Sequence, residues 1–274
     1  MTSAVGQAAD RRPIGVFDSG VGGLSVLIEL RRLLPAEDLV YFADSGNCPY
    51  GPRPATEIQA LSEQAGDFLR AQGAKALVVA CNTASAAGLD PLRARHEPQV
   101  PVIGLVPAVK PAVALTRSGV IGVLATPGTL RGALLRDVIA QWATPVGVRV
   151  VCDPGAGLVA AVEADRRDAP ATLAILRAAL GPMQAAGVDV VVLGCTHYPF
   201  LRPQIAAVAG LDLQTVDSGQ GVACQTARRL AEAGRLHPGS ESGQVRFYTS
   251  GDPAVVGAVM GRLLGAEVRC ESWR

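Results

Sequence analysis

The sequence predicts an α/β fold of two pseudo-symmetric domains, each built on a parallel sheet. Short β-branched runs alternate with longer amphipathic stretches along almost the whole chain, which is the pattern of repeated βα units. The chain also repeats itself: residues 14–17 (IGVF) resemble residues 121–124 (IGVL), and residues 76–81 (ALVVAC) resemble residues 190–195 (VVVLGC). Two such halves are expected to face one another, with the functional cleft between the carboxyl ends of their strands.

The expected strands follow from the β-branched runs, taken in chain order. They cover residues 14–17, 39–43, 76–80, 102–105, 121–124, 148–152, 188–193 and 213–216. Weaker runs of the same kind occur at 245–249 and 268–270.

The expected helices follow from apolar residues at helical spacing. The clearest covers residues 56–72, with Thr56 as its cap and Gly73 just past its end. Others cover residues 25–34 and 221–233, which stop at Pro35 and Gly234. A further helix over residues 172–186 contains Pro182 and is expected to be kinked or split there.

The length of 274 residues predicts about two domains. We expect a first, discontinuous domain over residues 1–103 and 213–274, which carries Asp18 and Cys81. The second domain covers residues 104–212 and carries Cys195.

The composition points to a small-molecule ligand. A formal net charge of +1, with no Lys-rich tract, gives no electrostatic footprint for nucleic acid or a membrane surface. No uncharged apolar run has the length of a membrane span, and residues 1–13 lack the apolar core of a signal peptide and are expected to form a frayed arm. The six cysteines form no CxxC pair, which favours free thiols in a reducing, cytoplasmic setting.

Two cysteines stand at equivalent places in the repeat. Cys81 and Cys195 each follow a buried apolar strand and precede polar residues suited to cap a helix. A cysteine that enters a helix N-terminus meets free N–H groups and the positive end of the helix dipole, which favour the thiolate. The alternative is a pair of buried core cysteines.

Polar loops follow the first two strands. Asp18 opens a glycine-rich turn that is not a dinucleotide fingerprint, because Ser25 stands where the third glycine would be. Asp18 is therefore expected either to cap a helix or to relay a proton from a thiol. The turn-rich residues 44–52 either present N–H groups to an anion or form a simple loop.

His197 and Glu163 are two further residues considered for the site. His197 stands beside Cys195, but with three histidines and no ligand spacing we expect no metal site. Periodicity does not show whether Glu163 faces the cleft or solvent.

Taken together, the motifs resemble those of the bacterial glutamate racemases, in the aspartate/glutamate racemase superfamily. They occur in order over residues 14–24 (IGVFDSGVGGL), 48–51 (CPYG), 80–85 (ACNTAS) and 193–199 (LGCTHYP). The resemblance covers residues 14 to about 219. It implies a cofactor-independent isomerase that interconverts L- and D-glutamate and supplies D-glutamate for peptidoglycan in the cell wall.

The resemblance also implies roles for individual residues. Cys81 and Cys195 would be the two acid/base residues, Cys81 acting on the D-enantiomer and Cys195 on the L-enantiomer, with Asp18 assisting the first and His197, with Glu163, the second. The substrate would lie against Asp18, Ser19, Tyr50, Gly51, Asn82, Thr83 and Thr196. Hydroxyl donors such as that of Thr126 would stabilise the carbanionic intermediate. The segment before Glu163 departs from the family's usual proline-containing pattern.

Other functions remain open from the sequence. An aspartate or hydantoin racemase of the same superfamily would use the same motifs. A noncatalytic thiol protein, for redox sensing or binding, would need neither two equivalent cysteines nor Asp18. A pyridoxal enzyme would need Lys75 or Lys110, the only two lysines. Besides the small-molecule substrate, a homodimer is the one partner kept open.

Overall fold

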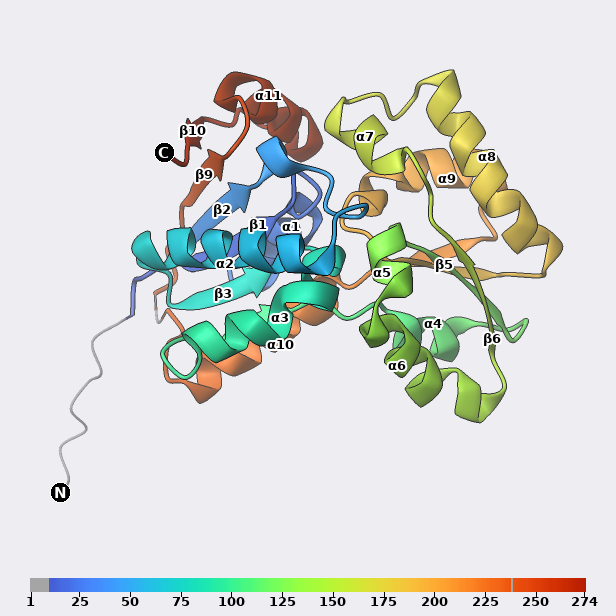
Figure 1. Cartoon of the computed structure of the whole chain (residues 1–274), viewed down its shortest axis with the longest axis horizontal. Coiled ribbons are helices and arrows are strands. Elements are labelled where there is room, and N and C mark those ends of the chain that lie inside the picture. The colour runs from blue at the N-terminus through green and yellow to red at the C-terminus, as the bar shows by residue number, and fades with distance from the viewer. Residues whose placement is uncertain (1–9, 238) are drawn as a thin grey trace.

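The computed structural model describes residues 10–237 and 239–274, and Figure 1 shows them as two α/β lobes side by side. The strands are β1 (Ile14–Asp18), β2 (Leu39–Ala43), β3 (Ala76–Val79), β4 (Val102–Gly104), β5 (Val120–Leu124), β6 (Arg149–Asp153), β7 (Val190–Leu193), β8 (Gln214–Val216), β9 (Val245–Thr249) and β10 (Cys270–Ser272). All their pairings are parallel, in one sheet of order β10-β9-β2-β1-β3-β4 and another of order β6-β5-β7-β8. The predicted fold class is confirmed.

Eleven α-helices connect the strands in the described part of the chain. They are α1 (Leu24–Leu33), α2 (Ala55–Ala71), α3 (Asn82–His96), α4 (Val109–Leu115), α5 (Pro127–Arg131), α6 (Ala133–Trp142), α7 (Leu158–Glu163), α8 (Pro170–Ala185), α9 (Arg202–Ala209), α10 (Gly219–Glu232) and α11 (Pro253–Leu264). Short 3₁₀ helices lie at Ser45–Asn47, Thr144–Val146 and Tyr198–Leu201. None of the helices in residues 10–237 and 239–274 has the length and apolar character needed to cross a lipid bilayer.

Both faces of the first sheet are buried. Along β2, Leu39 and Tyr41 join the core cluster that includes α1, α10 and α11, whereas Val40 and Phe42 join the cluster that includes α2 and α3. This division follows from the two-residue period of a strand. Burial on both faces also explains why these strands are continuous apolar runs in the sequence.

The second sheet is covered in the same way. Val190 and Val192 pack with α4 and α6, whereas Val191 and Leu193 join the cluster that includes α8 and α9. In Figure 1, α8 and α9 flank this sheet on one side and α4 and α6 on the other. After β8, the chain returns through α10 to the first lobe.

The predicted division into residues 1–103 with 213–274 and 104–212 stays a prediction. The hydrogen bonding places β8 beside β7, so the second sheet extends through Val216. The arm expected over residues 1–13 lies outside the described residues as far as residue 9. The adjoining residues are held in place, because Lys75 Nζ donates to the Asp10 carbonyl at 2.6 Å.

One helix prediction is wrong about the cap residue, and another is wrong about one of its two alternatives, a split at Pro182. Thr56 does not cap α2, since the helix begins at Ala55 and its N-cap residue is Pro54. Pro182 does not split α8, which runs as one helix over Pro170–Ala185. Pro182 lies near its end, and Gly187 has the positive φ that completes the helix terminus.

Candidate active site

A small cavity lies where the carboxyl ends of the two sheets meet. Its walls contain most of the predicted site residues, which come from segments that follow strands of both lobes: Ser19, Tyr50, Gly51, Cys81, Asn82, Thr83, Thr126, Cys195, Thr196 and His197. Pro49 and Val159 also line it. Its volume is about 10 Å³, which is roughly the space that one water molecule needs. The site is therefore closed, and a larger ligand requires the lobes to move apart.

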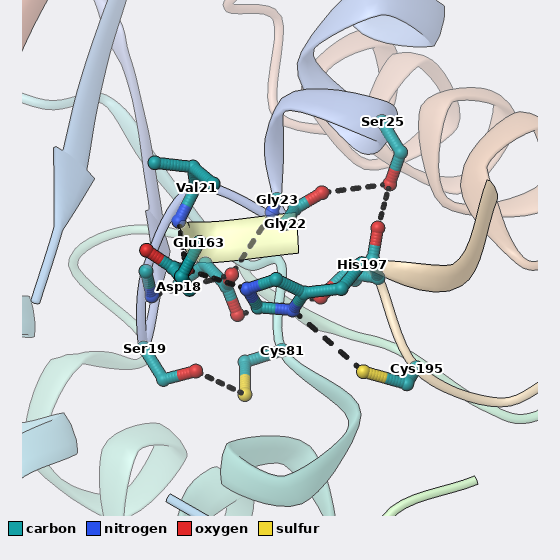
Figure 2. Close-up of polar contacts among 12 residues, drawn as sticks. Asp18, Ser19, Val21, Gly22, Gly23, Ser25, Cys81, Glu163, Cys195 and His197 are labelled. Atoms are coloured by element: carbon teal, nitrogen blue, oxygen red, sulfur yellow. Dashed lines mark hydrogen bonds and ion pairs between the residues drawn. The ribbon is translucent and has the colours of Figure 1, made fainter. Parts of the chain in front are cut away.

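Cys81 is the thiol that the first lobe contributes. It follows β3, stands at the N-cap position of α3 and is 4% exposed. Its Sγ donates to Ser19 Oγ at 3.8 Å, as Figure 2 shows. The fully buried Asp18 lies next to it and accepts a hydrogen bond from the Gly23 backbone N–H at 2.9 Å.

The α3 N-terminus acts on Cys81 in the predicted direction, because an N–H of its first turn lowers the pKa, but other groups outweigh it in this closed site. Burial raises the pKa of Cys81 well above its ordinary value, and the neighbouring Asp18 carboxyl raises it further. A hydrogen bond from the Ala84 backbone N–H acts in the opposite direction but is outweighed. Burial also raises the pKa of Asp18. Cys81 is accordingly protonated, as an acid that is ready to donate.

Cys195, 5% exposed, is the thiol that the second lobe contributes. It does not enter an α-helix as predicted, because the chain turns through the 3₁₀ helix Tyr198–Leu201 and α9 begins only at Arg202. Pro203, which has no N–H, occupies the first turn of α9 and suits such a start. Cys195 therefore lacks the helix dipole that Cys81 has.

A histidine and a carboxylate replace that dipole. Cys195 Sγ lies 3.7 Å from His197 Nδ1, and His197 Nε2 lies 2.6 Å from Glu163 Oε1 (Figure 2). The Val21 backbone N–H of the first lobe donates to the same carboxylate oxygen at 2.7 Å. Glu163, the last residue of α7, thus faces the site.

His197 is protonated in this setting. Burial lowers its pKa, but hydrogen bonds to Cys195, Cys48 and Glu163 outweigh burial and raise the pKa well above its ordinary value. His197 Nδ1 therefore lies in a position to exchange a proton with Cys195 Sγ.

Polar groups for a ligand come from both lobes. Thr83 Oγ1 and Thr126 Oγ1 are 2.8 Å apart and join the lobes across the cavity. Thr196 Oγ1 donates to Asp18 Oδ1 at 3.4 Å. Asn82 is 4% exposed, and its Nδ2 has no hydrogen-bond partner among the described residues. An unpaired buried donor of this kind costs free energy unless a ligand accepts from it.

A hydrogen-bond network that no sequence pattern indicates stabilises the loop with Tyr50 and Gly51. The buried Asp44 accepts from Tyr50 Oη at 2.5 Å and from Ser250 Oγ at 2.5 Å. Ser250 Oγ also accepts from the Gly46 N–H at 3.0 Å. The Tyr50 hydroxyl therefore points to Asp44. The only sequence signal for Ser250 is its place just after the weaker run at 245–249.

Within the described residues, one donor set suits a metal ion. Cys48, Glu163 and His197 each offer an atom, and these atoms lie within 4.8 Å of one another. No pattern in the sequence groups Cys48 with His197, because the two residues come from different lobes and lie close together only where the lobes meet.

Comparisons with known proteins agree with this architecture. Residues 14–226 match the model of the Asp/Glu/hydantoin racemase family. A glutamate racemase of Deinococcus radiodurans is 54% identical over 248 residues, which are 90% of this chain and 85% of that protein. One of Roseiflexus sp. is 51% identical over 243 residues, 88% of each chain.

Solved structures give the same result. A glutamate racemase of Bacillus anthracis superimposes with a TM-score of 0.85 at 33% identity, over 96% of this chain and 97% of that chain. A glutamate racemase of Francisella tularensis, solved in complex with D-glutamate, superimposes with a TM-score of 0.82 at 29% identity over the same shares.

Proposed function

The chain belongs to the Asp/Glu/hydantoin racemase family, and we propose that it interconverts L-glutamate and D-glutamate by proton transfer between two thiols, with no cofactor. Racemisation removes the α-proton from one face of the amino acid and delivers a proton to the other face. It therefore needs two acid/base groups that flank one carbon atom, one deprotonated and one protonated.

The observation that carries the proposal is the pair of buried thiols on one cavity. Cys81 comes from the first lobe and Cys195 from the second, each at the carboxyl end of a central strand. Each has a titratable partner of its own, Asp18 for Cys81 and the His197–Glu163 pair for Cys195. A thiol that only reported oxidation would need neither partner.

The two environments suit the conversion of L-glutamate to D-glutamate. Cys195 is the base in this direction: with His197 as its partner at 3.7 Å, it takes the α-proton and becomes a thiol. Cys81 donates its thiol proton to the opposite face of the α-carbon and becomes a thiolate. In the reverse direction the two cysteines exchange these roles. Asp18 takes up the proton that Cys81 must lose before it acts as a base, and His197 supplies the proton that Cys195 must carry to act as the acid.

Neutral donors provide for binding and for the charge of the carbanionic intermediate. The unpaired Asn82 amide and the hydroxyls of Ser19, Thr83, Thr126 and Thr196 lie on the cavity, and a closed site strengthens their interaction with developing negative charge. Because glutamate does not fit a cavity of about 10 Å³, the Thr83–Thr126 contact must open for substrate to enter and product to leave.

The substrate is the finer part of the proposal. Glutamate is favoured over aspartate or a hydantoin because the full-length relatives at about half identity are glutamate racemases, and because a solved relative from Escherichia coli binds L-glutamate. We further propose that D-glutamate made in the cytoplasm serves peptidoglycan synthesis. A bacterial strain that requires added D-glutamate should grow without it when it carries this gene, which tests that role. Light scattering tests whether the protein forms a homodimer.

Incubation with L-glutamate in deuterated water tests the activity. The reduced protein, with no cofactor added, should incorporate α-deuterium while circular dichroism decays to zero. L-aspartate in a parallel reaction should change far more slowly. Folded, reduced protein that leaves L-glutamate unexchanged would refute the proposal, and equal or faster turnover of aspartate would change its substrate.

A further inference from the structure

Cys48 is a third thiol beside the site: it hydrogen-bonds with His197 but takes no part in the proton transfers proposed above. It lies just after the 3₁₀ helix Ser45–Asn47, in the loop that follows β2. Its Sγ, a carboxylate oxygen of Glu163 and a ring nitrogen of His197 all lie within 4.8 Å of one another. The three residues come from three separate segments of the chain, and they lie close together because the two lobes meet there.

The loop after β1 leaves room for this group. A Cβ atom at Gly20 would lie 1.9 Å from Glu163 Oε1 and 3.1 Å from Cys48 Sγ. One at Gly22 would lie 2.2 Å from His197 Nδ1. Because these positions carry no side chain, the thiol, the carboxylate and the imidazole face one another directly.

We propose that Cys48, Glu163 and His197 bind Zn²⁺ and that the bound ion inhibits the enzyme. The inhibitory part of the inference rests on the proposed racemase function. Thiolate, imidazole and carboxylate are the ligands that zinc prefers, in a tetrahedral site whose fourth position holds water. The thiolate and the carboxylate together balance the charge of the ion.

The observed spacing is close to what zinc requires. Bonds of about 2.3 Å to sulfur and about 2.0 Å to nitrogen place these two ligands about 3.5 Å apart in a tetrahedral site. The atoms here lie within 4.8 Å, and the closest pair, His197 Nε2 and Glu163 Oε1, is 2.6 Å apart. Side-chain shifts of about 1 Å therefore complete the site. Binding releases two protons, one from the Cys48 thiol and one that His197 shares with Glu163.

The same ligands explain the inhibition. Glu163 now holds His197 through Nε2, while Nδ1 faces Cys195 Sγ. With a metal ion on Nε2, the ring can no longer exchange a proton with Glu163, so His197 can no longer pass protons to and from Cys195. Catalysis stops without any contact between the ion and the substrate.

Cobalt binding and zinc inhibition test the proposal separately. Co²⁺ added to the reduced full chain should bind at one site and give a thiolate charge-transfer band with the visible bands of tetrahedral cobalt. Cys48→Ser, whose hydroxyl keeps a hydrogen-bond partner for His197, should lose the charge-transfer band. Relative to its own rate without metal, it should need at least about tenfold more Zn²⁺ for half-inhibition. Cys224→Ser, at an exposed thiol of α10, should behave like the unaltered protein.

The inactive variant Cys81→Ala separates this inference from the proposed function, since it should still bind Co²⁺. Lack of a cobalt spectrum in the unaltered protein would overturn the metal site. Inhibition of Cys48→Ser at the same Zn²⁺ concentration would place the ion on Cys81 and Cys195 and would equally overturn it. Metal binding without racemase activity would refute only the proposed function.

Discussion

Replacing Ser250 with alanine should weaken substrate binding without slowing the chemistry. Ser250 touches no catalytic group, but its Oγ donates to the buried Asp44 at 2.5 Å and accepts from the Gly46 N–H at 3.0 Å. Asp44 in turn accepts from the Tyr50 hydroxyl. Ser250→Ala therefore removes one support of the loop that carries the proposed substrate contacts Tyr50 and Gly51.

The size of the effect follows from the bonds lost. A hydrogen bond to a charged group contributes about 1.5–3 kcal/mol and a neutral one about 1 kcal/mol. Asp44 keeps its bonds from Tyr50 and Asn47, so about 2 kcal/mol is a reasonable total. If the substrate must restore the order of the loop, KM rises by up to about 30-fold, at 1.4 kcal/mol for each factor of ten.

Steady-state racemisation followed by circular dichroism measures KM and kcat. Ser242→Ala, at an exposed serine, is the matched control. We expect a higher KM and an unchanged kcat in both directions, which is the pattern for loss of binding shared by the ground state and the transition state. The two enantiomers have equal free energies, so kcat/KM must fall equally in both directions. A fall in kcat with KM unchanged, or no difference from Ser242→Ala, would refute the reasoning.

Two other predictions concern buried charges. Because the pKa of His197 is raised, its protonation contributes stability that is complete below the unfolded-state pKa of about 6.5 and is lost as pH rises through the folded-state pKa. Glu163→Gln should lower that pKa and move the loss to lower pH, as an NMR titration of the ring would show; an unchanged titration would contradict it. In the other pair, Lys75 Nζ lies 2.6 Å from Glu37 Oε2, and both side chains are buried. Glu37→Ala should reduce the free energy of unfolding by about 3–5 kcal/mol. Adding Lys75→Met should recover part of it in denaturant titrations, and a further loss would count against this account.

The local sequence pattern was sufficient to predict the two sheets and to predict that the two thiols lie close together. β-branched runs predict the strands because both faces of each sheet are buried, and polar residues that follow parallel strands gather at one edge. Cys81 and Cys195 share a cavity for that reason. The resemblance of residues 76–81 to residues 190–195 predicts that the two cysteines come from different halves of the chain.

Contacts between segments that are distant in the chain could not be predicted from the sequence. Ser250 hydrogen-bonds with Asp44, which is 206 residues away in the chain, and no sequence pattern near either residue predicts this contact. Cys48 joins His197 only because the lobes close. The raised pKa of Cys81 was also missed, because its cause is burial and Asp18, which depend on tertiary packing. A helix N-terminus alone suggested the opposite direction.

The central claim is that each thiol serves one face of the α-carbon, and single-cysteine variants in deuterated water test it most directly. Cys81→Ala, which keeps Cys195, should exchange the α-proton of L-glutamate with retention of configuration and leave D-glutamate untouched. Cys195→Ala should exchange D-glutamate alone, and neither variant should racemise. Exchange of both enantiomers by one variant, or racemisation by either, would contradict the assignment of one thiol to each face.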